Sequence, residues 1–464
     1  MTNSLSSELI KSLRQIVGER AVSANAEDRL LYSYDGTMLE FRPAAVVFPT
    51  SAAQISSIMG LAGQHHVPVV PRGAGTNLSG GSLPVSGGLV VSLTRMNRVL
   101  AVNPENLTAI VEPGVVNGDL QKHISRYGLF FPPDPASMNV CTIGGNVASC
   151  AGGPRCLKYG VTRDYVLGLE AVLPSGEVIR TGGQAIKNVT GYDLTRLLVG
   201  SEGTLGIITQ IIIRLLPMPE AKKTMLVIFN SLVSAGQAVS AIIANGIVPA
   251  TLELMDKLAM QCAEDYVHVG LPREAQAVLI IEVDGFKESL DRQVETIERI
   301  CREEGAVETR IAESDEEADG LWLARRTILG AVGRIKPSFV IQDVTVPRQS
   351  LAEIIESVQE TSRKYDVPIV VVAHAGDGNL HPIAMLDKRN PDEVRRAEEA
   401  EGEIISHALA LGGTLSGEHG IGLAKKDFMP MEYGHTEMRI ARGLKKLFDP
   451  NNLLNPGKIV GGNA

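Results

Sequence analysis

The sequence predicts an α+β protein built from two domains and a C-terminal helical segment. The chain has 464 residues, more than one hydrophobic core usually accommodates. Apolar strands, helices and glycine-rich turns alternate up to about residue 216, which is typical of α/β or α+β domains. After Pro217 and Pro219 the order strand–helix–strand–strand–helix occurs approximately twice, as in two ferredoxin-like halves. We therefore expect domains at 1–220 and 221–425 and a last segment at 426–464.

The elements of the first region follow from apolar runs and capping signals. A helix is expected at 5–32. Ser51 and Gln54 form a capping-box pattern, so a second helix should run from there to about residue 66. The histidines at its end, His65 and His66, are expected at the surface. Strands are expected at 44–49, 67–71, 88–93 and 107–111, and a long β-branched strand at 206–216 closes the region.

The sequence of the second region predicts five strands, followed by a return strand after Asn379. The strands are expected at 224–229, 250–254, 278–283, 339–346 and 368–373. Helices are expected up to residue 244, near 287–304, up to about residue 365 and near 391–411.

Composition excludes several classes of protein. Hydrophobic residues make up 44% and charged residues 21% of the chain, which argues against disorder. The formal charge is -9 and no long run of Lys or Arg occurs, so we expect no nucleic-acid partner. No signal peptide or membrane span is visible in the sequence. The five cysteines are scattered and form no CxxC pair, which favours a reduced, cytoplasmic protein without an iron–sulfur cluster of its own.

A glycine-rich loop after the strand at 67–71 is the first chemical signal. Four glycines leave backbone N–H groups uncovered, and Thr76, Asn77 and Ser79 add polar side chains, which suits a diphosphate. The loop lacks the Gly-Lys-Ser/Thr of a P-loop and the third glycine of a dinucleotide fingerprint. By itself it is explained nearly as well by a structural turn. The glycines are Gly73, Gly75, Gly80 and Gly81.

Further turn-rich segments follow in the same half, at 112–114, 133–137, 142–146, 151–153 and 200–209. Each could be a tight turn. Together they predict a long ligand that the backbone holds at several points.

The ordered set PRGAGTNLSGG, PDPAS, TIGGN and GSEGTLGIIT resembles the FAD domain of the vanillyl-alcohol oxidase type. The resemblance implies pyrophosphate contacts at 72–77 and 144–146, and adenine or ribose contacts near Glu202 and at 207–208. Some relatives attach the flavin through a His in the first loop. This chain offers Thr76 and Asn77 there, so we expect non-covalent FAD. The implied cofactor-binding residues are Pro71, Arg72, Gly73, Ala74, Gly75, Thr76, Asn77, Ser79, Gly80, Pro113, Gly114, Pro135, Ala136, Ser137, Thr142, Gly144, Gly145, Asn146, Gly153, Tyr159, Gly160, Glu202, Gly206, Ile207, Ile208 and Asn455.

A histidine pair is the second chemical signal. Asp377-Gly378 is a typical two-residue hairpin turn, and it would place His374 directly opposite His381 on one face. Two imidazoles so placed can bind one divalent ion, and His is the commonest metal ligand. A cross-strand His pair without a metal is the alternative.

Two more patches add charged groups. Glu418 lies in the glycine-flanked stretch 416–422 and could complete a two-His, one-carboxylate site, while its neighbour His419 could face a substrate. A solvent-exposed polar turn is the alternative. Arg325 follows Trp322, the only Trp of the chain, and suits bidentate binding of a carboxylate, although a helix-surface Arg would be the default interpretation.

These three patches in this order resemble the FAD-linked 2-hydroxy-acid dehydrogenases over nearly the whole chain. The stretches 333–337 and 343–347 resemble the glycolate oxidase flavoprotein subunit and bacterial D-lactate dehydrogenases most, and the ending 447–458 is the part that returns to the flavin domain in the family. Enzymes for D-2-hydroxyglutarate place Lys and Thr where this chain has Leu329 and Ile341, which favours a monocarboxylate.

The resemblance implies an FAD-dependent oxidation of D-lactate or glycolate to the 2-oxo acid. Arg325 would hold the carboxylate, a zinc, manganese or iron ion on His374, His381 and Glu418 would assist the hydroxyl, and His419 would be the base. Electrons would pass to a separate acceptor, such as an iron–sulfur subunit, an electron-transfer flavoprotein, a cytochrome or a quinone, and such a partner could hold the protein at a membrane. The alternatives are a D-2-hydroxyglutarate dehydrogenase, a non-redox transferase on the same flavin domain, and a metal hydrolase with structural glycine loops.

Overall fold

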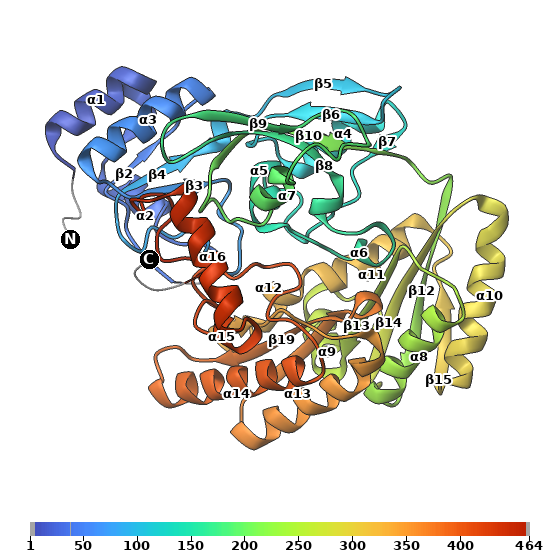
Figure 1. The fold of residues 1–464 in the computed structure, drawn as a ribbon. Helices are drawn as coiled ribbons and strands as arrows, with labels where there is room; N and C mark the ends of the chain where they lie inside the picture. The colour runs from blue at the N-terminus through green and yellow to red at the C-terminus, as the bar shows by residue number, and fades with distance from the viewer. Residues whose placement is uncertain (1–4, 38, 461–464) are drawn as a thin grey trace. The chain divides into compact units, whose positions relative to one another are not determined.

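The computed structural model describes residues 5–37 and 39–460, so the polar start at 1–4 lies outside the described residues. Contacts divide the chain into two compact units, each built from separate stretches (Figure 1). Unit 1 comprises the described residues of Met1–Gly152, Gly160–Met218 and Glu418–Ala464. Unit 2 comprises Gly153–Tyr159 and Pro219–Gly417. The expected domain limits at 220 and 425 stay a prediction.

The first sheet of unit 1 has the order β1-β2-β4-β3. Strands β2 and β3 run parallel to β4, and β1 is antiparallel to β2. Helices α1 and α3 cover this sheet through a core that includes Leu13, Ile58 and Val91. The elements are α1 (Ser7–Val17), β1 (Val22–Ser23), α2 (Ala26–Leu31), β2 (Ala45–Val47), α3 (Ala52–His65), β3 (Val69–Arg72) and β4 (Leu89–Ser92).

The sequence located α3 correctly and mistook the N-terminal region for one helix. Ser51 caps α3 by accepting the Gln54 N–H, as the capping box predicts, and His65 and His66 are exposed as expected. The expected helix at 5–32 is wrong. Gly18 has φ of 95°, a conformation that ends α1, and strand β1 separates α1 from α2.

The second sheet of unit 1 is antiparallel, with the order β5-β6-β10-β8-β9. Helix α16 brings the last part of the chain back to unit 1, since Lys445 in α16 donates to the backbone oxygens of Thr204 and Leu454. The remaining elements of unit 1 are β5 (Val99–Asn103), β6 (Thr108–Val111), α4 (Asn117–Ser125), β7 (Leu129–Phe130), α5 (Ile143–Ser149), β8 (Val166–Val172), β9 (Val178–Gly182), α7 (Leu194–Leu198), β10 (Ile207–Arg214), β11 (Leu216–Pro217), α15 (Met429–Glu432) and α16 (His435–Phe448).

Unit 2 contains one antiparallel sheet with the order β15-β12-β14-β13-β18-β19-β16 along its main path. The two predicted ferredoxin-like halves are confirmed, and they are unequal. The first half is a complete four-stranded unit with the sequence order 4-1-3-2. The second half has β16, β18 and β19, and its fourth strand is reduced to an isolated bridge between Thr345 and Thr414.

Helices line both faces of this sheet. On one face, Met260, Trp322 and Ile328 from α9, α11 and α12 pack against strand residues such as Ile280 and Val372. Helices α8, α10, α13 and α14 form the other layer (Figure 1). The elements of unit 2 are α6 (Cys156–Tyr159), β12 (Ala221–Phe229), α8 (Leu232–Ala244), β13 (Thr251–Asp256), α9 (Lys257–Val267), β14 (Ala277–Gly285), α10 (Lys287–Glu303), β15 (Ala306–Ile311), α11 (Asp315–Arg326), α12 (Ile328–Val332), β16 (Ser338–Ile341), β17 (Val344–Thr345), α13 (Leu351–Tyr365), β18 (Ile369–His374), β19 (Asn379–Leu386) and α14 (Pro391–Ala410).

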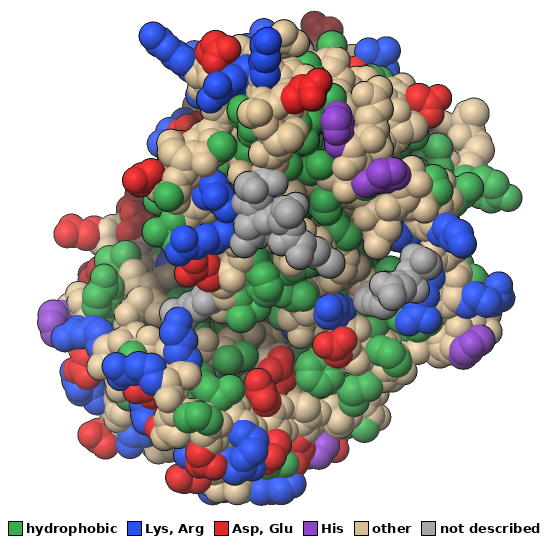
Figure 2. All heavy atoms as spheres, turned by 90° about the vertical axis from the view of Figure 1, so that its left-hand side faces the viewer, with side chains coloured by type: hydrophobic (Ala, Val, Ile, Leu, Met, Phe, Trp, Pro, Cys, Tyr) green, Lys and Arg blue, Asp and Glu red, His purple; other side chains and the backbone are tan. Residues whose placement is uncertain are grey.

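The surface carries charges of both signs. On the face shown in Figure 2, Lys and Arg side chains are interspersed with Asp and Glu side chains. Within the described residues, no helix has the length and apolar content that crossing a membrane requires.

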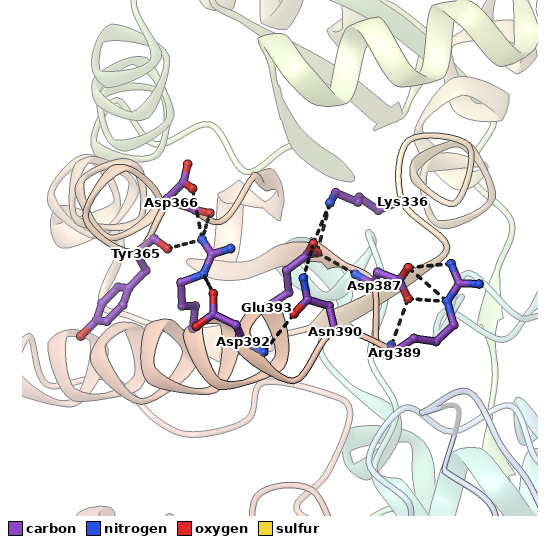
Figure 3. Close-up of polar contacts among 9 residues, drawn as sticks. Lys336, Tyr365, Asp366, Asp387, Arg389, Asn390, Asp392 and Glu393 are labelled. Carbon is purple, nitrogen blue, oxygen red and sulfur yellow. Dashed lines mark hydrogen bonds and ion pairs between the residues drawn. The ribbon is translucent and has the colours of Figure 1, made fainter.

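A polar network fixes the start of α14 (Figure 3). The Asn390 side chain accepts the Asp392 N–H, and Glu393 accepts the Asp387 N–H at 2.8 Å and pairs with Lys336 at 3.1 Å. Arg389 holds the pKa of Asp387 low, at about 2, through hydrogen bonds. These contacts tie α14 to the end of β19, so we assign them a structural role.

Candidate functional site

The glycine-rich loop of unit 1 uses its polar side chains to hold itself in place. Arg72 is buried at the end of β3, donates to the Tyr34 carbonyl oxygen at 2.8 Å and lies over the ring of Tyr32. Asn77 donates to the Asp35 carboxylate at 2.7 Å and accepts from the Ser82 hydroxyl at 2.7 Å. Burial lowers the pKa of Arg72. Arg72 and Asn77 are therefore engaged within the protein, where their contacts stabilise the loop.

Three of the predicted cofactor segments lie against one another in unit 1. Thr142 caps α5 by accepting the Gly145 N–H, and Gly144 donates its N–H to the Pro113 carbonyl at 2.8 Å. A Cβ on Gly144 would lie 2.4 Å from the Pro113 Cβ, and one on Gly73 would lie 2.3 Å from the Thr142 Oγ1. The loop, the 113–114 turn and α5 can therefore approach this closely only because both positions are glycine.

Glu202 links the same loops to the end of the chain. Its side chain is buried and accepts the Ile421 N–H at 2.8 Å, and burial raises its pKa against the opposing effect of the Gly422 and Ile421 N–H groups. Asn455 donates to the carbonyl oxygens of Gly81 and Glu202 at 2.7 and 2.8 Å. Four stretches that are distant in the sequence thus meet in unit 1.

The other predicted cofactor residues are placed as follows. Pro135 begins a turn in which the Met138 N–H donates to its carbonyl, and Ala136 and Ser137 lie within that turn. Gly160 has φ of 84°, and Gly206 directly precedes β10, which begins with the buried Ile207 and Ile208. Gly153 and Tyr159 belong to unit 2, where the Tyr159 hydroxyl donates to Asp284 at 2.7 Å. Of the remaining members, Pro71 lies in β3 and Gly114 in the turn already described, and the loop contains Ala74, Gly75, Thr76, Ser79 and Gly80.

The histidine pair of unit 2 forms, but with a different register from the predicted one. His374 lies opposite Asn379, and His381 lies opposite Val372. The expected two-residue turn is wrong, because 375–377 form a 3-10 turn and Gly378, at φ of 83°, closes a longer loop. The two imidazoles are diagonal neighbours on one face, with ring centroids 5.0 Å apart.

A buried carboxylate joins His374 to Arg325. The Nδ1 of His374 lies 2.7 Å from Oε1 of Glu253 in β13, and the Nε of Arg325 in α11 lies 2.8 Å from Oε2. All three residues are buried. Desolvation by burial raises the pKa of Glu253, but the adjacent His374 and Arg325 outweigh it, so the pKa is lowered on balance. The Arg325–Glu253 contact is close without being aligned as a hydrogen bond, and Arg325 Nη2 has no hydrogen-bond partner among the described residues. Arg325 is therefore no surface residue.

A second set of buried polar groups orients His381. Its Nδ1 lies 3.3 Å from the Gln342 carbonyl oxygen and 3.9 Å from the Asp343 carboxylate. Asp343 accepts from Asn379 Nδ2 at 2.8 Å and from the Ser416 hydroxyl at 2.6 Å. In both histidines Nδ1 faces protein oxygens, which directs Nε2 toward any ligand.

Glu418 and His419 follow directly on this set. Glu418 follows Gly417, the last residue of unit 2. A Cβ added to Gly417 would lie 2.4 Å from the Thr345 Oγ1, so the chain packs tightly there. The side chains of Glu418 and His419 are only 15% and 12% exposed, and their Oε1 and Nε2 atoms are 3.8 Å apart. This stretch is therefore not the solvent-exposed turn considered as the alternative.

Comparison with known proteins decides the family. Residues 218–459, more than half of the chain, match the family described as FAD linked oxidases, C-terminal domain, and residues 43–182 match the FAD binding domain. The chain belongs to the FAD-linked oxidases. It is an FAD-linked oxidoreductase, as the sequence predicts.

Two curated relatives of this oxidase cover almost its whole length. It is 47% identical to the glycolate oxidase subunit GlcD of Bacillus subtilis (strain 168), over 99% of this chain and 98% of the relative. It is 33% identical to a D-lactate dehydrogenase of Anaerostipes hadrus, over 98% of both chains.

Solved structures confirm the expected fold class of the oxidase. A p-cresol methylhydroxylase with substrate bound matches with a TM-score of 0.82 at 19% identity, over 98% of this chain and 96% of that one. An alkyldihydroxyacetonephosphate synthase matches with a TM-score of 0.77 at 20% identity, over 98% and 86%. The chain thus combines α+β organisation with an FAD-binding domain of the vanillyl-alcohol oxidase type.

The unit 1 loops of the oxidase fit FAD by their chemistry. Asn146 Nδ2 is a buried donor and Glu202 Oε2 a buried acceptor, and neither has a hydrogen-bond partner among the described residues. Buried polar atoms of this kind are expected to be paired by a ligand or by water. The close approach at Gly73 and Gly144 brings three of the segments implied in cofactor binding next to one another.

Several polar residues of the oxidase escaped the sequence analysis. Glu253 and Asp343 are buried carboxylates within or beside apolar strands, and Lys458, buried where it donates to the Leu83 carbonyl, has its pKa lowered to about 8 by burial. The available signal was a charged residue inside an apolar run, as in Thr251–Asp256. Such a residue rarely lies in a core without a partner.

Proposed function

We propose that this oxidase converts a small 2-hydroxy acid, glycolate or D-lactate, into the 2-oxo acid and passes the electrons to a separate acceptor. The observation that carries the proposal is the buried array in unit 2 that Arg325 of α11 forms with the sheet residues Glu253, His374 and His381. A buried guanidinium with an unpaired N–H suits a carboxylate. The names of the relatives, glycolate oxidase subunit and D-lactate dehydrogenase, support this class of substrate.

Arg325 would bind the substrate carboxylate and so fix the position of the carbon that carries the hydroxyl. His374, His381 and Glu418 would hold a divalent ion, since two imidazoles and a carboxylate suit zinc, manganese or ferrous iron. Such an ion supplies a positive charge that lowers the pKa of a hydroxyl group.

His419 would accept the hydroxyl proton, a role that the near-neutral pKa of an imidazole allows. When bound, FAD would supply the two-electron oxidant that removal of the Cα hydrogen with its electron pair requires. The substrate thereby loses two hydrogens and becomes the 2-oxo acid. We expect the flavin to be non-covalent, because Thr76 and Asn77 stand where some relatives carry a linking histidine.

A monocarboxylate is preferred over D-2-hydroxyglutarate in this proposal. Leu329 and Ile341 are partly buried and pack against the apolar cluster around Trp322, so neither position offers a cation to a second carboxylate. A non-redox transferase is the second candidate, because an alkyldihydroxyacetonephosphate synthase shares the fold.

The acceptor is proposed to be another protein or a quinone. Two relatives are named as subunits, which supports a partner chain. The five free cysteines support a reducing compartment such as the cytoplasm.

The test is anaerobic mixing of the FAD-loaded protein with glycolate, D-lactate, L-lactate and D-2-hydroxyglutarate. Bleaching of the flavin absorbance by glycolate or D-lactate is the expected result. No bleaching by any acid would favour the transferase, and a colourless protein that takes up no FAD would favour a hydrolase.

His419→Ala should retain flavin and metal and slow flavin reduction by on the order of 100-fold or more, the usual contribution of a general base. Stopped-flow absorbance measures the reduction rate, and His435→Ala is the matched control, because His435 begins α16 and is exposed. Reduction of the variant at the wild-type rate would remove His419 from the mechanism.

A further inference from the structure

Glu253 contacts both an expected metal ligand, His374, and the expected carboxylate-binding residue, Arg325. Its side chain is completely buried, with one oxygen 2.7 Å from His374 and the other 2.8 Å from Arg325. We infer that Glu253 is a positioning residue that orients His374 for metal binding and Arg325 for substrate binding at the same time. The inference rests on the proposed function.

The burial of Glu253 is costly unless the carboxylate has partners. Glu253 shares the strand face of Met255, which belongs to the apolar cluster with Trp322 and Ile280. An apolar residue at this position would avoid the desolvation of a charge, which is large in such surroundings. A single ion pair with Arg325 would use only one of the two carboxylate oxygens. A purely structural ion pair with Arg325 does not explain why His374 contacts the second oxygen.

The contact with Glu253 determines which nitrogen of His374 carries the proton. An ionised carboxylate can only accept hydrogen bonds, so the Nδ1 of His374 must donate. The Nε2 atom then keeps its lone pair, which is the form of imidazole that binds a metal ion. The Gln342 carbonyl acts on Nδ1 of His381 in the same way.

The contact with Arg325 restrains the guanidinium from one side. Glu253 lies beside Nε, while Nη2 is buried without a hydrogen-bond acceptor among the described residues. The negative charge of Glu253 stabilises the buried cation, and the fixed plane presents the remaining N–H groups to an anion.

The test measures the affinity of the FAD-loaded, metal-free protein for Zn²⁺ by competition with a chromophoric chelator. Glu253→Gln should weaken zinc binding by about 10- to 100-fold, the usual effect of removing such a partner. Glu253→Asp keeps the charge but is too short to reach both partners, so it should also weaken binding. The matched control is Glu282→Gln. Glu282 is a buried carboxylate on the neighbouring strand β14 that accepts from Thr224 and Trp322 instead, so its loss should leave zinc affinity unchanged.

A second readout separates orientation from folding. Nitrogen-15 NMR of the histidine side chains should show His374 protonated at Nδ1 in wild type and a mixture of tautomers in Glu253→Gln, with His374→Ala assigning the signals. If Glu253→Gln fails to fold because Arg325 is left unpaired, Glu253→Gln/Arg325→Met removes both charges and replaces the single variant in both measurements.

Wild-type zinc affinity and an unchanged His374 tautomer in the Glu253 variants would overturn the inference while leaving the proposed metal site intact. If wild type and His374→Ala bind zinc equally, the metal part of the proposed function fails, and the role of Glu253 in metal binding fails with it.

Discussion

At the scale of single residues, Arg325 shows how burial changes the meaning of a common side chain. It lies in the last turn of α11, where an exposed Arg would serve only to complement the helix dipole. The guanidinium instead faces Glu253 inside unit 2. Its neighbour Arg326 is exposed and lies over the Trp322 ring at 5.9 Å. Two adjacent arginines therefore have distinct environments, which makes them a matched pair for mutation.

Arg325→Lys should lower kcat/KM for the hydroxy acid on the order of 100-fold, about 2.7 kcal/mol of transition-state binding. The charge is kept, but the planar fork that pairs with a carboxylate and with Glu253 is lost. Steady-state kinetics with an artificial electron acceptor measures the effect. Arg326→Lys should behave as wild type, and equal losses in both variants would show that Arg325 has no special role.

Sequence reasoning identified the side chains that belong to recognisable motifs and missed their buried partners. His374, His381 and Arg325 were predicted, and the structure brings them together through Glu253. Glu253 is 121 residues away from His374 in the sequence, so no local pattern connects the two. Asp343 was missed as a partner for the same reason, because its neighbours Asn379 and Ser416 come from distant elements.

At the scale of elements, the sequence predicts which segments are strands and helices better than it predicts their pairing. Helix α14 and strands β14 and β18 lie within a few residues of their expected limits. The turn after β18 was expected to be two residues long, and a 3-10 turn there changed the register. The turn sequence is compatible with a two-residue turn and with the longer loop. The packing of Gly378 distinguishes the two, because a Cβ on Gly378 would lie 2.2 Å from the Val346 carbonyl oxygen.

The junction of β13 and α9 makes stability depend on pH. Asp256 caps α9 by accepting the Ala259 N–H at 2.7 Å and also accepts the Val371 N–H of β18 at 3.0 Å. Burial raises its pKa to about 7 from the usual 3.8. The folded state therefore holds this proton more tightly than the unfolded state, and the resulting stabilisation is complete below pH 3.8 and lost as pH rises through about 7.

Asp256→Asn removes this titration, so the variant should keep the stability that wild type loses between pH 5 and pH 8. The unfolding free energy of the variant minus that of wild type should therefore increase by about 2–3 kcal/mol from pH 5 to pH 8. Urea unfolding at the two pH values measures the difference. Asp387→Asn is the control: the pKa of Asp387 is about 2, so its contribution is lost only as pH falls from 3.8 through about 2, and this variant should track wild type above pH 5. A pH-independent gap for Asp256→Asn would refute the assignment.

At the scale of the whole molecule, each compact unit is assembled from separate stretches of chain. The last stretch, from Glu418, belongs with the first unit, and the short stretch Gly153–Tyr159 belongs with the second. Resemblance to a family predicted that the chain end returns to the flavin domain, and contacts of Asn455 and Lys458 with 81–83 fit that expectation. Composition and periodicity alone could not have predicted it, because neither carries information on contacts between distant segments.

The cysteines of the chain bear on whether it holds a redox centre other than the flavin. The five cysteines are scattered along the chain without a CxxC pair, and burial raises the pKa values of Cys262 and Cys301 to about 11 and about 12. Burial also raises the pKa values of Cys141 and Cys150. The flavin is therefore expected to be the single redox centre of this chain.

Anaerobic titration of the FAD-loaded protein with dithionite should consume two electrons per chain and end when the flavin is fully bleached, since no other group would accept them. The same sample should contain no acid-labile sulfide, the marker of an iron–sulfur cluster. Sustained oxidation of glycolate or D-lactate should then require an added acceptor, because two electrons fill the capacity of the chain after one turnover. Uptake of more than two electrons per chain would reveal a second redox centre and contradict the need for a separate acceptor. Uptake of two electrons per chain, with turnover restored by an acceptor dye, would instead support a partner that receives electrons from this flavin.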